Sequence, residues 1–349
     1  MRSLLDGLQD QEAGDVLSLS TTSAAARSIA PWAKRREDGA VAPLALGTMN
    51  FGKRTSAKDA ERIIHLALDL GVTVLDTANA YNDGESERIV GAALRGHRDR
   101  AFIATKVGFK RVAGRPEGLA PSRIVAAIDE SLKNLAVDQV DLYYLHVPDH
   151  ATPLGETLGA VAEILRQGKA KAFGVSNYGS WQILEIFYAC DRMQMPRPVI
   201  AQQIYNLLIR QLDLEYMRFA SRFGLHTTVY NPLAGGLLTG VHRDRTSIAA
   251  RSRFDGNKLY QGRYWSDPMR AHADAYEDLA KAHGLSAMEL AYAWLAQAPG
   301  VDSILVGPGS EAHLKDAVRT AKIAIAPELR AAVDKLHVAH LGTETTYAR

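Results

Sequence analysis

Val72-Thr-Val-Leu-Asp-Thr-Ala-Asn-Ala-Tyr81 is the stretch from which the fold and the chemistry of this chain can be worked out. It begins with a short, unbroken run of apolar and β-branched residues, which is typical of a strand buried on both faces, as in parallel sheets. The run leads directly into Asp76. A carboxylate in such a place needs a partner, because an unpaired buried charge is very costly. The rest of the chain must therefore supply a cation or hydrogen-bond donors for Asp76.

Similar apolar runs alternate with helical patterns from residue 41 onward. In the first of these helices, Ser56 and Asp59 form a variant capping box, and Gly71 stands where a terminating glycine belongs. Strict alternation of eight strands with eight helices predicts parallel βαβ units that close into an α/β fold, the (β/α)8 or TIM barrel. The predicted strands cover residues 43–47, 72–75, 101–105, 140–145, 171–175, 198–202, 225–229 and 302–306.

An open doubly wound sheet is the alternative architecture for the same alternation. It is expected to carry a glycine-rich phosphate loop after its first strand, and Gly47-Thr-Met-Asn-Phe-Gly52 does not fit G-x-G-x-x-G. The segment 231–267 has no clear period, and we interpret it as extra loops on a single barrel domain of residues 41–349. Residues 1–40 are polar and rich in alanine and serine, which predicts an irregular N-terminal extension.

The composition of the chain narrows its class. Its 349 residues are 47% hydrophobic and 23% charged, as expected for a globular protein with a large core. The net charge of +2 gives no reason to expect nucleic acid or membrane as a partner. The single cysteine, Cys190, rules out an intrachain disulfide and fits a small buried packing residue.

The sequence also argues against membrane, secretory and metal signals. No apolar run approaches the roughly 18 residues that a membrane-spanning helix needs. Residues 1–40 lack the apolar core of a secretory signal. No pair of histidines has metal-ligand spacing on one helix. We therefore expect a cytoplasmic protein without a metal.

Polar residues recur where the predicted strands end. In a barrel of parallel strands, all carboxyl-terminal ends open on one rim, where active sites are built. Each residue alone has a plainer interpretation, such as a structural ion pair for Asp76 and Lys106 or a hydrogen-bonded core residue for His146. Their recurrence on successive strands favours one shared site. The residues concerned are Asp76, Lys106, His146, Ser176, Asn177, Gln203 and Tyr230.

These side chains suit the protonation of a carbonyl group. Lys106 and Asp76 are expected to pair on neighbouring strands, and Tyr81 lies on the loop that follows Asp76. A phenol has a pKa of about 10. A nearby ammonium group is expected to lower that pKa, which makes Tyr81 a candidate general acid. His146 can donate a hydrogen bond to a carbonyl oxygen or relay a proton.

The hydride must come from outside this set, because none of its side chains is a hydride donor or a credible acyl nucleophile. A nicotinamide cofactor is therefore predicted. Ser176, Asn177 and Gln203 offer hydroxyl and amide groups for its carboxamide. Tyr230 offers a ring that can stack on the nicotinamide.

Several longer motifs accompany these residues. They are Leu46-Gly-Thr-Met-Asn-Phe-Gly52, Asp76-Thr-Ala-Asn-Ala-Tyr81, Tyr144-Leu-His-Val-Pro-Asp149, Gly174-Val-Ser-Asn-Tyr178 and Tyr230-Asn-Pro-Leu-Ala-Gly-Gly-Leu-Leu-Thr-Gly240. With these motifs, residues 41–349 resemble the aldo-keto reductases. Within that family they are most similar to the aflatoxin-aldehyde or succinic-semialdehyde reductases.

The resemblance implies a small aldehyde or ketone as substrate and NADPH as cofactor, with NADH as the alternative. It implies a catalytic tetrad of Asp76, Tyr81, Lys106 and His146. The residues expected to hold the cofactor are Ser176, Asn177, Gln203, Tyr230, Asn231, Pro232, Leu233, Gly235, Gly307, His313 and Asp316. We expect a monomer or a homodimer.

The substrate side of the site is predicted from two kinds of residue. Arginines that match Arg253 and Arg349 hold a substrate carboxylate in the family that this chain resembles. Candidates for the walls of the pocket, with plain packing as the alternative, are Met49, Phe51, Trp181 and Tyr264.

The chain departs from the family pattern in two places. Where relatives often place Arg or Gln and then Asn around the adenosine phosphate, this chain has His313 and Ala317. His313, Lys315 and Arg319 remain candidates to meet a 2′-phosphate. The second departure is the N-terminal extension, which stands where the family usually has a hairpin that plugs the bottom of the barrel.

Two other functions fit parts of the same pattern. A barrel lyase would use Lys106 as a Schiff-base nucleophile, but a lysine paired with Asp76 stays protonated. A nicotinamide-binding regulatory subunit with little turnover would keep the cofactor residues. The presence of all four members of the tetrad argues for an enzyme.

Overall fold

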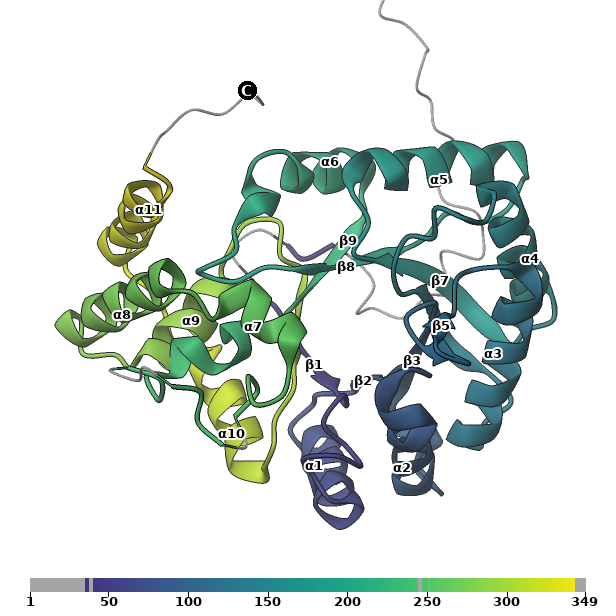
Figure 1. Cartoon of the computed structure of the whole chain (residues 1–349), viewed down its shortest axis with the longest axis horizontal. Coiled ribbons are helices and arrows are strands. Elements are labelled where there is room, and N and C mark those ends of the chain that lie inside the picture. Colours follow the sequence, from purple (N-terminus) through teal and green to yellow (C-terminus); the bar gives the residue numbers. More distant parts are fainter. Residues whose placement is uncertain (1–34, 38–39, 244–246, 251, 343–349) are drawn as a thin grey trace, which may run out of the picture.

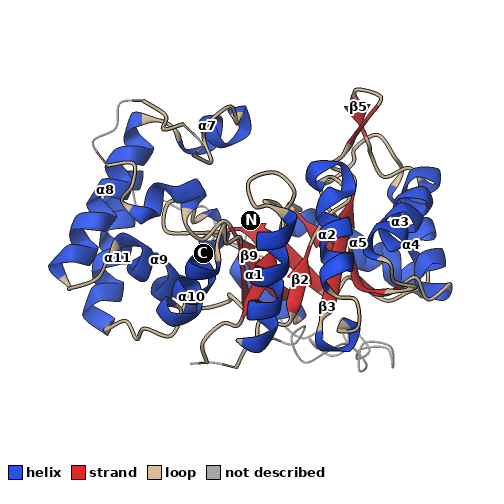
Figure 2. Ribbon diagram, turned by 90° about the horizontal axis from the view of Figure 1, so that it is seen from below, coloured by secondary structure: helices blue, strands red, loops and turns tan. Residues whose placement is uncertain are grey.

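The computed structural model describes residues 35–37, 40–243, 247–250 and 252–342 (Figure 1). Within these residues, eight parallel strands form a closed barrel in the order β1-β10-β9-β8-β7-β6-β3-β2. The helices lie outside the strands (Figure 2). The prediction of a (β/α)8 barrel is thereby confirmed. The barrel strands are β1 (Leu44–Gly47), β2 (Val74–Asp76), β3 (Phe102–Val107), β6 (Val140–Leu145), β7 (Ala170–Ser176), β8 (Ile200–Ile204), β9 (His226–Tyr230) and β10 (Ser303–Val306).

The helices follow the patterns that predicted them. In the first one, Ser56 Oγ accepts the backbone N–H of Asp59 at 3.2 Å, which is one half of the predicted capping box, and the Asp59 carboxylate accepts the Ser56 hydroxyl at 2.6 Å. The α-helices are α1 (Ala57–Asp69), α2 (Glu85–Ala93), α3 (Pro121–Leu135), α4 (Leu154–Arg166), α5 (Ser180–Arg192), α6 (Tyr216–Phe223), α7 (Lys258–Tyr264), α8 (Asp267–Ala282), α9 (Ala287–Ala296), α10 (Glu311–Thr320) and α11 (Pro327–Leu341).

The structure adds elements that the sequence patterns did not predict. A two-stranded hairpin of β4 (Arg111–Val112) and β5 (Arg115–Pro116) stands between β3 and α3. The stretch without a clear period contains a 3-10 helix, Ala234–Thr239, and the short helix α7. Both features contain glycine and are too short or too irregular to show a hydrophobic period, so no pattern in the sequence marks them.

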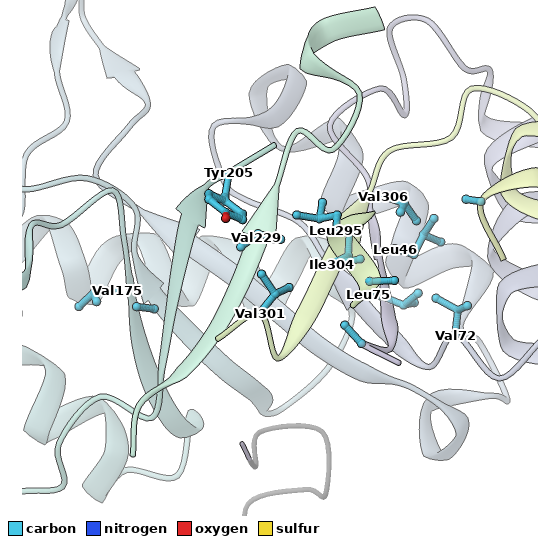
Figure 3. Close-up of a cluster of buried hydrophobic side chains, with 14 of the residues drawn as sticks. Leu46, Val72, Leu75, Val175, Tyr205, Val229, Leu295, Val301, Ile304 and Val306 are labelled. Atoms are coloured by element: carbon cyan, nitrogen blue, oxygen red, sulfur yellow. The ribbon is translucent and has the colours of Figure 1, made fainter. Parts of the chain in front are cut away.

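Most apolar side chains are buried between the barrel and its helices. Figure 3 shows Val229 of β9, Ile304 of β10 and Leu295 of α9 in this layer, and none of the three is exposed. A second, smaller cluster fills the inside of the barrel and consists of Ala104, Leu142, Tyr144, Ala172 and Ile200. Side chains alternate between these two layers along each strand. The alternation decides which polar side chains reach the inside of the barrel.

The described part of the N-terminal segment is fastened to the bottom of the barrel, where β10 begins. The backbone N–H of Arg36 donates to Asp302 at 2.7 Å, and its guanidinium donates to Val301 O at 2.8 Å and to Ala298 O at 2.7 Å. Arg35 forms an ion pair with Asp302 at 3.3 Å. Most of the predicted extension, residues 1–34, lies outside the described residues.

Membrane-spanning helices and metal sites can both be looked for among the described residues. None of their helices is both long enough and apolar enough to cross a membrane. They also contain no group of three or more histidine, cysteine or acidic side chains with the geometry of a metal site. Cys190 is buried in α5, and burial raises the pKa of its thiol to about 12, as expected for a packing residue.

A histidine cluster joins α8 to α11 at the periphery of the molecule (Figure 1). The ring of His272 stacks on that of His340 at 3.8 Å between centroids. Both ring nitrogens of His272 are buried without a hydrogen-bond partner among the described residues. Burial, and then electrostatic interaction with His340, His337 and Arg210, lower the pKa of His272 to about 3.

This cluster predicts that the protein loses stability in mild acid. His272 takes up a proton at a pH of about 6.5 in the unfolded chain but only near 3 in the folded one. Acidification from pH 7 to 5 therefore favours the unfolded chain, and we expect His272 alone to cost about 1–2 kcal/mol. Thermal midpoints at both pH values measure the loss. His272→Phe is expected to flatten the pH dependence, and His283→Phe, on the exposed end of α8, should leave it unchanged. Equal slopes in all three proteins would contradict the assignment.

Candidate active site

The centre of the site is a buried ion pair inside the barrel. Asp76 ends β2 and is in register with Ala104 of β3, so Lys106, two residues further on, faces the same interior. The Lys106 ammonium donates to one oxygen of Asp76 and to Thr77 O, the latter at 2.7 Å. Gln202 of β8 donates to the other Asp76 oxygen at 2.9 Å. The buried Asp76 carboxylate thus has a cation, Lys106, and an amide donor, Gln202, as partners.

Tyr81 lies beside this pair, at the start of a 3-10 turn of residues Tyr81–Gly84. The centroid of its ring is 5.2 Å from the Lys106 nitrogen. The ring of His146 is 5.9 Å away, centroid to centroid, and meets Tyr81 edge to face at 79°. Four groups from three strand ends and one loop therefore meet at one mouth of the barrel.

The prediction that the Lys106 ammonium lowers the pKa of Tyr81 is wrong. Burial raises the pKa of Tyr81 well above its usual value, and Asp76 raises it further. The reason is that Asp76 neutralises Lys106 at close range, so the phenol meets a paired charge and not a free cation. Burial also lowers the pKa of Lys106, although Asp76 opposes that shift. Tyr81 is therefore a protonated phenol at neutral pH.

His146 follows β6 and is held by its backbone, whose N–H donates to Val107 O at 2.9 Å. Burial, with the nearby Lys106 charge, lowers the pKa of His146 well below its usual value. The ring is therefore a neutral imidazole. Its Nδ1 is buried without a hydrogen-bond partner among the described residues. The centroid of the Phe109 ring lies 5.1 Å from that of the His146 ring.

Three of the predicted cofactor residues lie together beside His146. The Tyr230 hydroxyl donates to Asn177 Oδ1 at 2.6 Å. The Asn177 amide donates to His146 O at 2.9 Å and to Ser176 Oγ at 3.1 Å. Asn177 has a left-handed backbone with φ of 65°, a conformation that asparagine tolerates better than most residues. The half-buried ring of Tyr230 is thereby tied to the strand end that carries Ser176.

Gln203 requires a correction, because its neighbour occupies the place predicted for it. The Gln203 amide donates to Tyr178 O at 2.6 Å, on the side of the strand away from Asp76. Gln202 faces the barrel interior, since successive side chains of a strand point to opposite faces. Two adjacent glutamines after one apolar run cannot be told apart by composition. Gln202 was therefore missed.

The loop after β9 contains the predicted residues Asn231, Pro232, Leu233 and Gly235. Asn231 has φ of 66°, and its Oδ1 accepts the N–H of Gly235 at 2.9 Å. Gly235 has φ of 69°, and a Cβ placed on it would lie 2.9 Å from the ring of Tyr260. Pro232 is buried, and Leu233 is half-buried against the core. The glycine is required here both by the backbone and by the close approach of α7.

The predicted residues of the last βα unit lie around the start of α10. Gly307 follows β10, and its carbonyl accepts the Asn50 amide at 3.3 Å. Ser310 caps the helix by accepting the N–H of His313 at 3.2 Å. His313 is exposed, and Asp316 is half-buried. Ala317, where relatives often have a polar residue, packs in the core.

The predicted substrate residues do not all reach the site. Phe51 and Tyr264 are completely buried, so as pocket walls they are corrected to packing residues. The Tyr264 hydroxyl accepts from Asn231 at 2.8 Å, which fixes it within the core. Met49 is half-buried next to the Tyr81 turn, and its carbonyl accepts the Asn82 amide at 3.3 Å.

The remaining substrate predictions differ in their outcome. Trp181 is 67% exposed at the start of α5. Arg349 lies outside the described residues. Arg253 is close enough to the Tyr81 phenol that its charge opposes the rise in the pKa of Tyr81 that burial and Asp76 cause. Its guanidinium carbon is 5.3 Å from the ring centroid of Tyr260.

Sequence reasoning missed three residues near this arginine and the tetrad. Tyr260 and Arg263 are one turn apart on α7, and the Arg263 guanidinium carbon is 6.0 Å from the Tyr260 ring centroid. Phe109 touches His146 from the excursion after β3. The i, i+3 spacing of two large polar side chains is a signal for the first pair. No pattern in the sequence identifies Phe109.

With this geometry in place, the chain can be compared with known proteins. The sequence profile of the Aldo/keto reductase family matches residues 43–337. This chain belongs to the aldo/keto reductase family. It is 37% identical to aflatoxin B1 aldehyde reductase member 2 of Homo sapiens over 287 residues, which cover 77% of this chain and 79% of the relative.

Other members of the family are similar over comparable lengths. The human protein named aldo-keto reductase family 7 member A3 is 34% identical over 294 residues, which cover 79% of this chain and 88% of that protein. A probable voltage-gated potassium channel subunit beta of Arabidopsis thaliana is 30% identical over 290 residues, or 81% of this chain and 88% of that protein. As an aldo/keto reductase, the chain is an NAD(P)H-dependent oxidoreductase, and its reaction is carbonyl reduction.

Proposed function

We propose that this aldo/keto reductase reduces an aldehyde or ketone to the alcohol with NADPH, and that Tyr81 is the general acid. The observation that carries the proposal is the meeting of four groups at one mouth. Lys106 is paired with Asp76, its nitrogen is 5.2 Å from the Tyr81 ring centroid, and the His146 ring centroid is 5.9 Å from that of Tyr81.

Each member of the tetrad has a distinct part in moving the proton. Tyr81 is protonated at neutral pH and gives its proton to the carbonyl oxygen as that oxygen gains charge. The phenolate that remains is stabilised by the ammonium of Lys106, which Asp76 keeps in place. His146 is a neutral imidazole and donates a hydrogen bond to the same carbonyl oxygen. A reduced nicotinamide, when bound, supplies the hydride.

The residues beside His146 fit a nicotinamide by the chemistry of their donors and acceptors. Ser176 offers a hydroxyl, while Asn177 and Gln202 offer amides that can both donate to and accept from a carboxamide. Tyr230 offers a half-buried ring whose hydroxyl is already anchored, so little side-chain entropy remains to be lost on stacking. These residues would hold the cofactor over the tetrad.

The preference for NADPH is proposed from the start of α10. His313 and Lys315 are exposed at the third and fifth positions of this helix, whose N-terminus itself favours an anion. Arg319 is less available, because it donates to Glu289 at 2.8 Å. A 2′-phosphate on the adenosine would meet these side chains, and NADH has no such group.

The substrate is proposed to carry an anionic group near its carbonyl. Arg253 lies close to the Tyr81 phenol, and the Arg263 charge opposes the rise in the pKa of Tyr230 that burial causes. One guanidinium near the proton donor and a second near Tyr230 favour a carboxylate on the substrate. The human relative named aflatoxin B1 aldehyde reductase acts, by its name, on an aldehyde, and an aldehyde is our first choice here.

A panel of carbonyl compounds tests this function. The loss of absorbance of the reduced nicotinamide is measured with NADPH and with NADH, using succinic semialdehyde, 4-nitrobenzaldehyde and propanal. We expect turnover with NADPH, a higher KM for NADH, and a lower KM for succinic semialdehyde than for propanal. No turnover on any compound with either cofactor would refute the proposal.

One second candidate is favoured by a specific finding. Plant relatives named as probable potassium channel beta subunits match most of the chain, so a regulatory subunit that binds a nicotinamide is the alternative. Tight cofactor binding with negligible turnover would favour it. The lyase alternative is not favoured, because the Lys106 side chain is fully buried and donates to both Asp76 and Thr77 O.

A further inference from the structure

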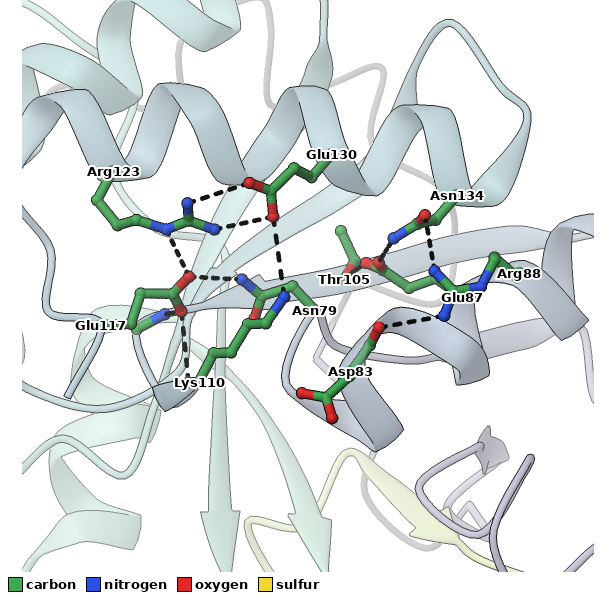
Figure 4. A network of polar contacts seen from close by, with 11 residues as sticks. Asn79, Asp83, Glu87, Arg88, Thr105, Lys110, Glu117, Arg123, Glu130 and Asn134 are labelled. Carbon is green, nitrogen blue, oxygen red and sulfur yellow. Dashed lines mark hydrogen bonds and ion pairs between the residues drawn. The ribbon is translucent and has the colours of Figure 1, made fainter. Parts of the chain in front are cut away.

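Between β3 and α3 the chain makes an excursion, residues 108–120, that carries the β4–β5 hairpin. Glu117 lies at the end of this hairpin, and its side chain has no exposed surface. Its two carboxylate oxygens are used fully. Oε1 accepts from the Asn79 amide at 2.8 Å and from Arg123 Nε at 2.7 Å. Oε2 accepts the backbone N–H of Gly108 at 2.8 Å and that of Lys110 at 3.4 Å (Figure 4).

All four partners of this side chain are donors, two on each oxygen. A carboxylate is the only side-chain group of this size that presents two acceptors, one on each side. A glutamine of the same shape would turn its NH2 group toward one pair of donors. Whichever way it turned, the hydrogen bonds on one side of Glu117 would be lost.

The two sides of Glu117 correspond to the two sides of the catalytic mouth. Asn79 stands two residues before Tyr81, and its own backbone N–H donates to Lys106 O at 3.3 Å. Gly108 and Lys110 flank Phe109, whose ring centroid is 5.1 Å from that of His146. One oxygen of Glu117 therefore holds the loop that carries Tyr81. The other oxygen holds the backbone on both sides of Phe109, whose ring lies against His146.

We propose that Glu117 is a positioning residue for the reaction: it locks the Tyr81 loop to the excursion after β3, and so keeps the phenol and the His146 ring at their working distance. This inference rests on the proposed function, because it assigns the spacing a role in proton transfer. Glu117 itself touches neither Tyr81 nor His146. Misplacement of a reacting group by about 1 Å can cost a hundredfold in rate.

The chain offers a matched control for the test. Glu130 binds the same Arg123, at 3.0 and 3.1 Å, and pairs with the Lys110 ammonium at 3.9 Å, but it accepts no hydrogen bond from Asn79 or from the backbone of Gly108 and Lys110 (Figure 4). Glu117→Gln and Glu130→Gln therefore make the same chemical change on the same arginine. The two variants differ in whether the acid loop and the excursion are released.

The experiment measures kcat with 4-nitrobenzaldehyde and NADPH, the Kd of NADPH by fluorescence quenching, and hydrogen–deuterium exchange of the full chain. At a temperature well below the thermal midpoint, we expect kcat of Glu117→Gln to be lower than that of the unaltered protein by about tenfold or more. The Kd of NADPH should stay within about twofold of its value in the unaltered protein. Exchange should be faster in residues 77–84 and 108–110. Glu130→Gln should match the unaltered protein in kcat, in the Kd of NADPH and in the exchange of residues 77–84; its ion pair with Lys110 makes residues 108–110 less suitable for this comparison.

Two results would overturn the inference. One is a Glu117→Gln variant whose kcat is unchanged while its thermal midpoint falls, because that is the result of a merely structural role. The other is unchanged exchange in the Tyr81 loop, which decides the matter even if the protein reduces no carbonyl. An unaltered protein without turnover would instead refute the proposed function, so the two failures are distinguishable.

Discussion

Tyr81→Phe is expected to lower kcat at least about a hundredfold while the Kd of NADPH stays within about twofold. The substitution removes only the hydroxyl, so the ring can still contact the Lys106 ammonium and His146. What is lost is the proton for the carbonyl oxygen. Steady-state oxidation of NADPH with an aldehyde of the panel measures kcat, and fluorescence quenching measures cofactor affinity.

Tyr188→Phe is the control for this result. Tyr188 is 53% exposed on α5, outside the barrel, so the same chemical change there should leave kcat unaltered. A Tyr81→Phe variant with normal turnover would contradict the assignment of the acid. Equal losses in both variants would point to a general effect on folding.

Lys106→Met is expected to have the largest effect on stability. It leaves the Asp76 carboxylate buried with Gln202 as its remaining side-chain donor. Removal of one partner of a buried ion pair typically costs about 3–5 kcal/mol, because the other charge stays unpaired. For a chain of this size we expect the thermal midpoint to fall by roughly 5 °C, together with loss of turnover.

A second substitution distinguishes the effect of losing the Lys106–Asp76 ion pair from the effect of leaving the Asp76 carboxylate buried and unpaired. In the double variant Lys106→Met with Asp76→Asn, no charge remains in the barrel, and most of the lost thermal stability should return. Turnover should not return, because the phenolate of Tyr81 would still lack its ammonium neighbour. A double variant less stable than Lys106→Met would show that the stranded carboxylate is not the source of the cost.

The strand-end residues were predictable from the sequence for a simple physical reason. Parallel strands of a barrel end on one rim, so Asp76, Lys106 and His146 had to share it once the alternation of strands and helices was recognised. The motif spacing placed Tyr81 on the adjoining loop. The fold and the meeting of these four side chains therefore follow from local patterns and one topological rule, whereas a catalytic tetrad is what the resemblance to the aldo-keto reductases implies.

Other features depend on facts that a linear pattern does not contain. Whether Gln202 or Gln203 faces inward depends on the phase of a strand, which the barrel as a whole decides. The direction of the pKa shift of Tyr81 depends first on its burial and then on the charge of Asp76, neither of which a linear pattern gives. The excursion that carries Phe109 and Glu117 has no hydrophobic period, because its conformation is held by charge-assisted hydrogen bonds.

The Arg36 fastening has a consequence for how the protein folds. β1 pairs with β10, so the barrel closes only when strands from nearly opposite ends of the chain meet, and such long-range contacts form slowly. Arg36 and Ala42 bind the residues just before β10, through Val301 O and Ala296 O at 2.8 and 2.9 Å. These contacts stabilise the barrel next to the β1–β10 pair, where it closes. Loss of Arg36 should therefore act on the lifetime of the closed barrel, by speeding the separation of its first and last strands, and leave the chemistry at the far mouth untouched.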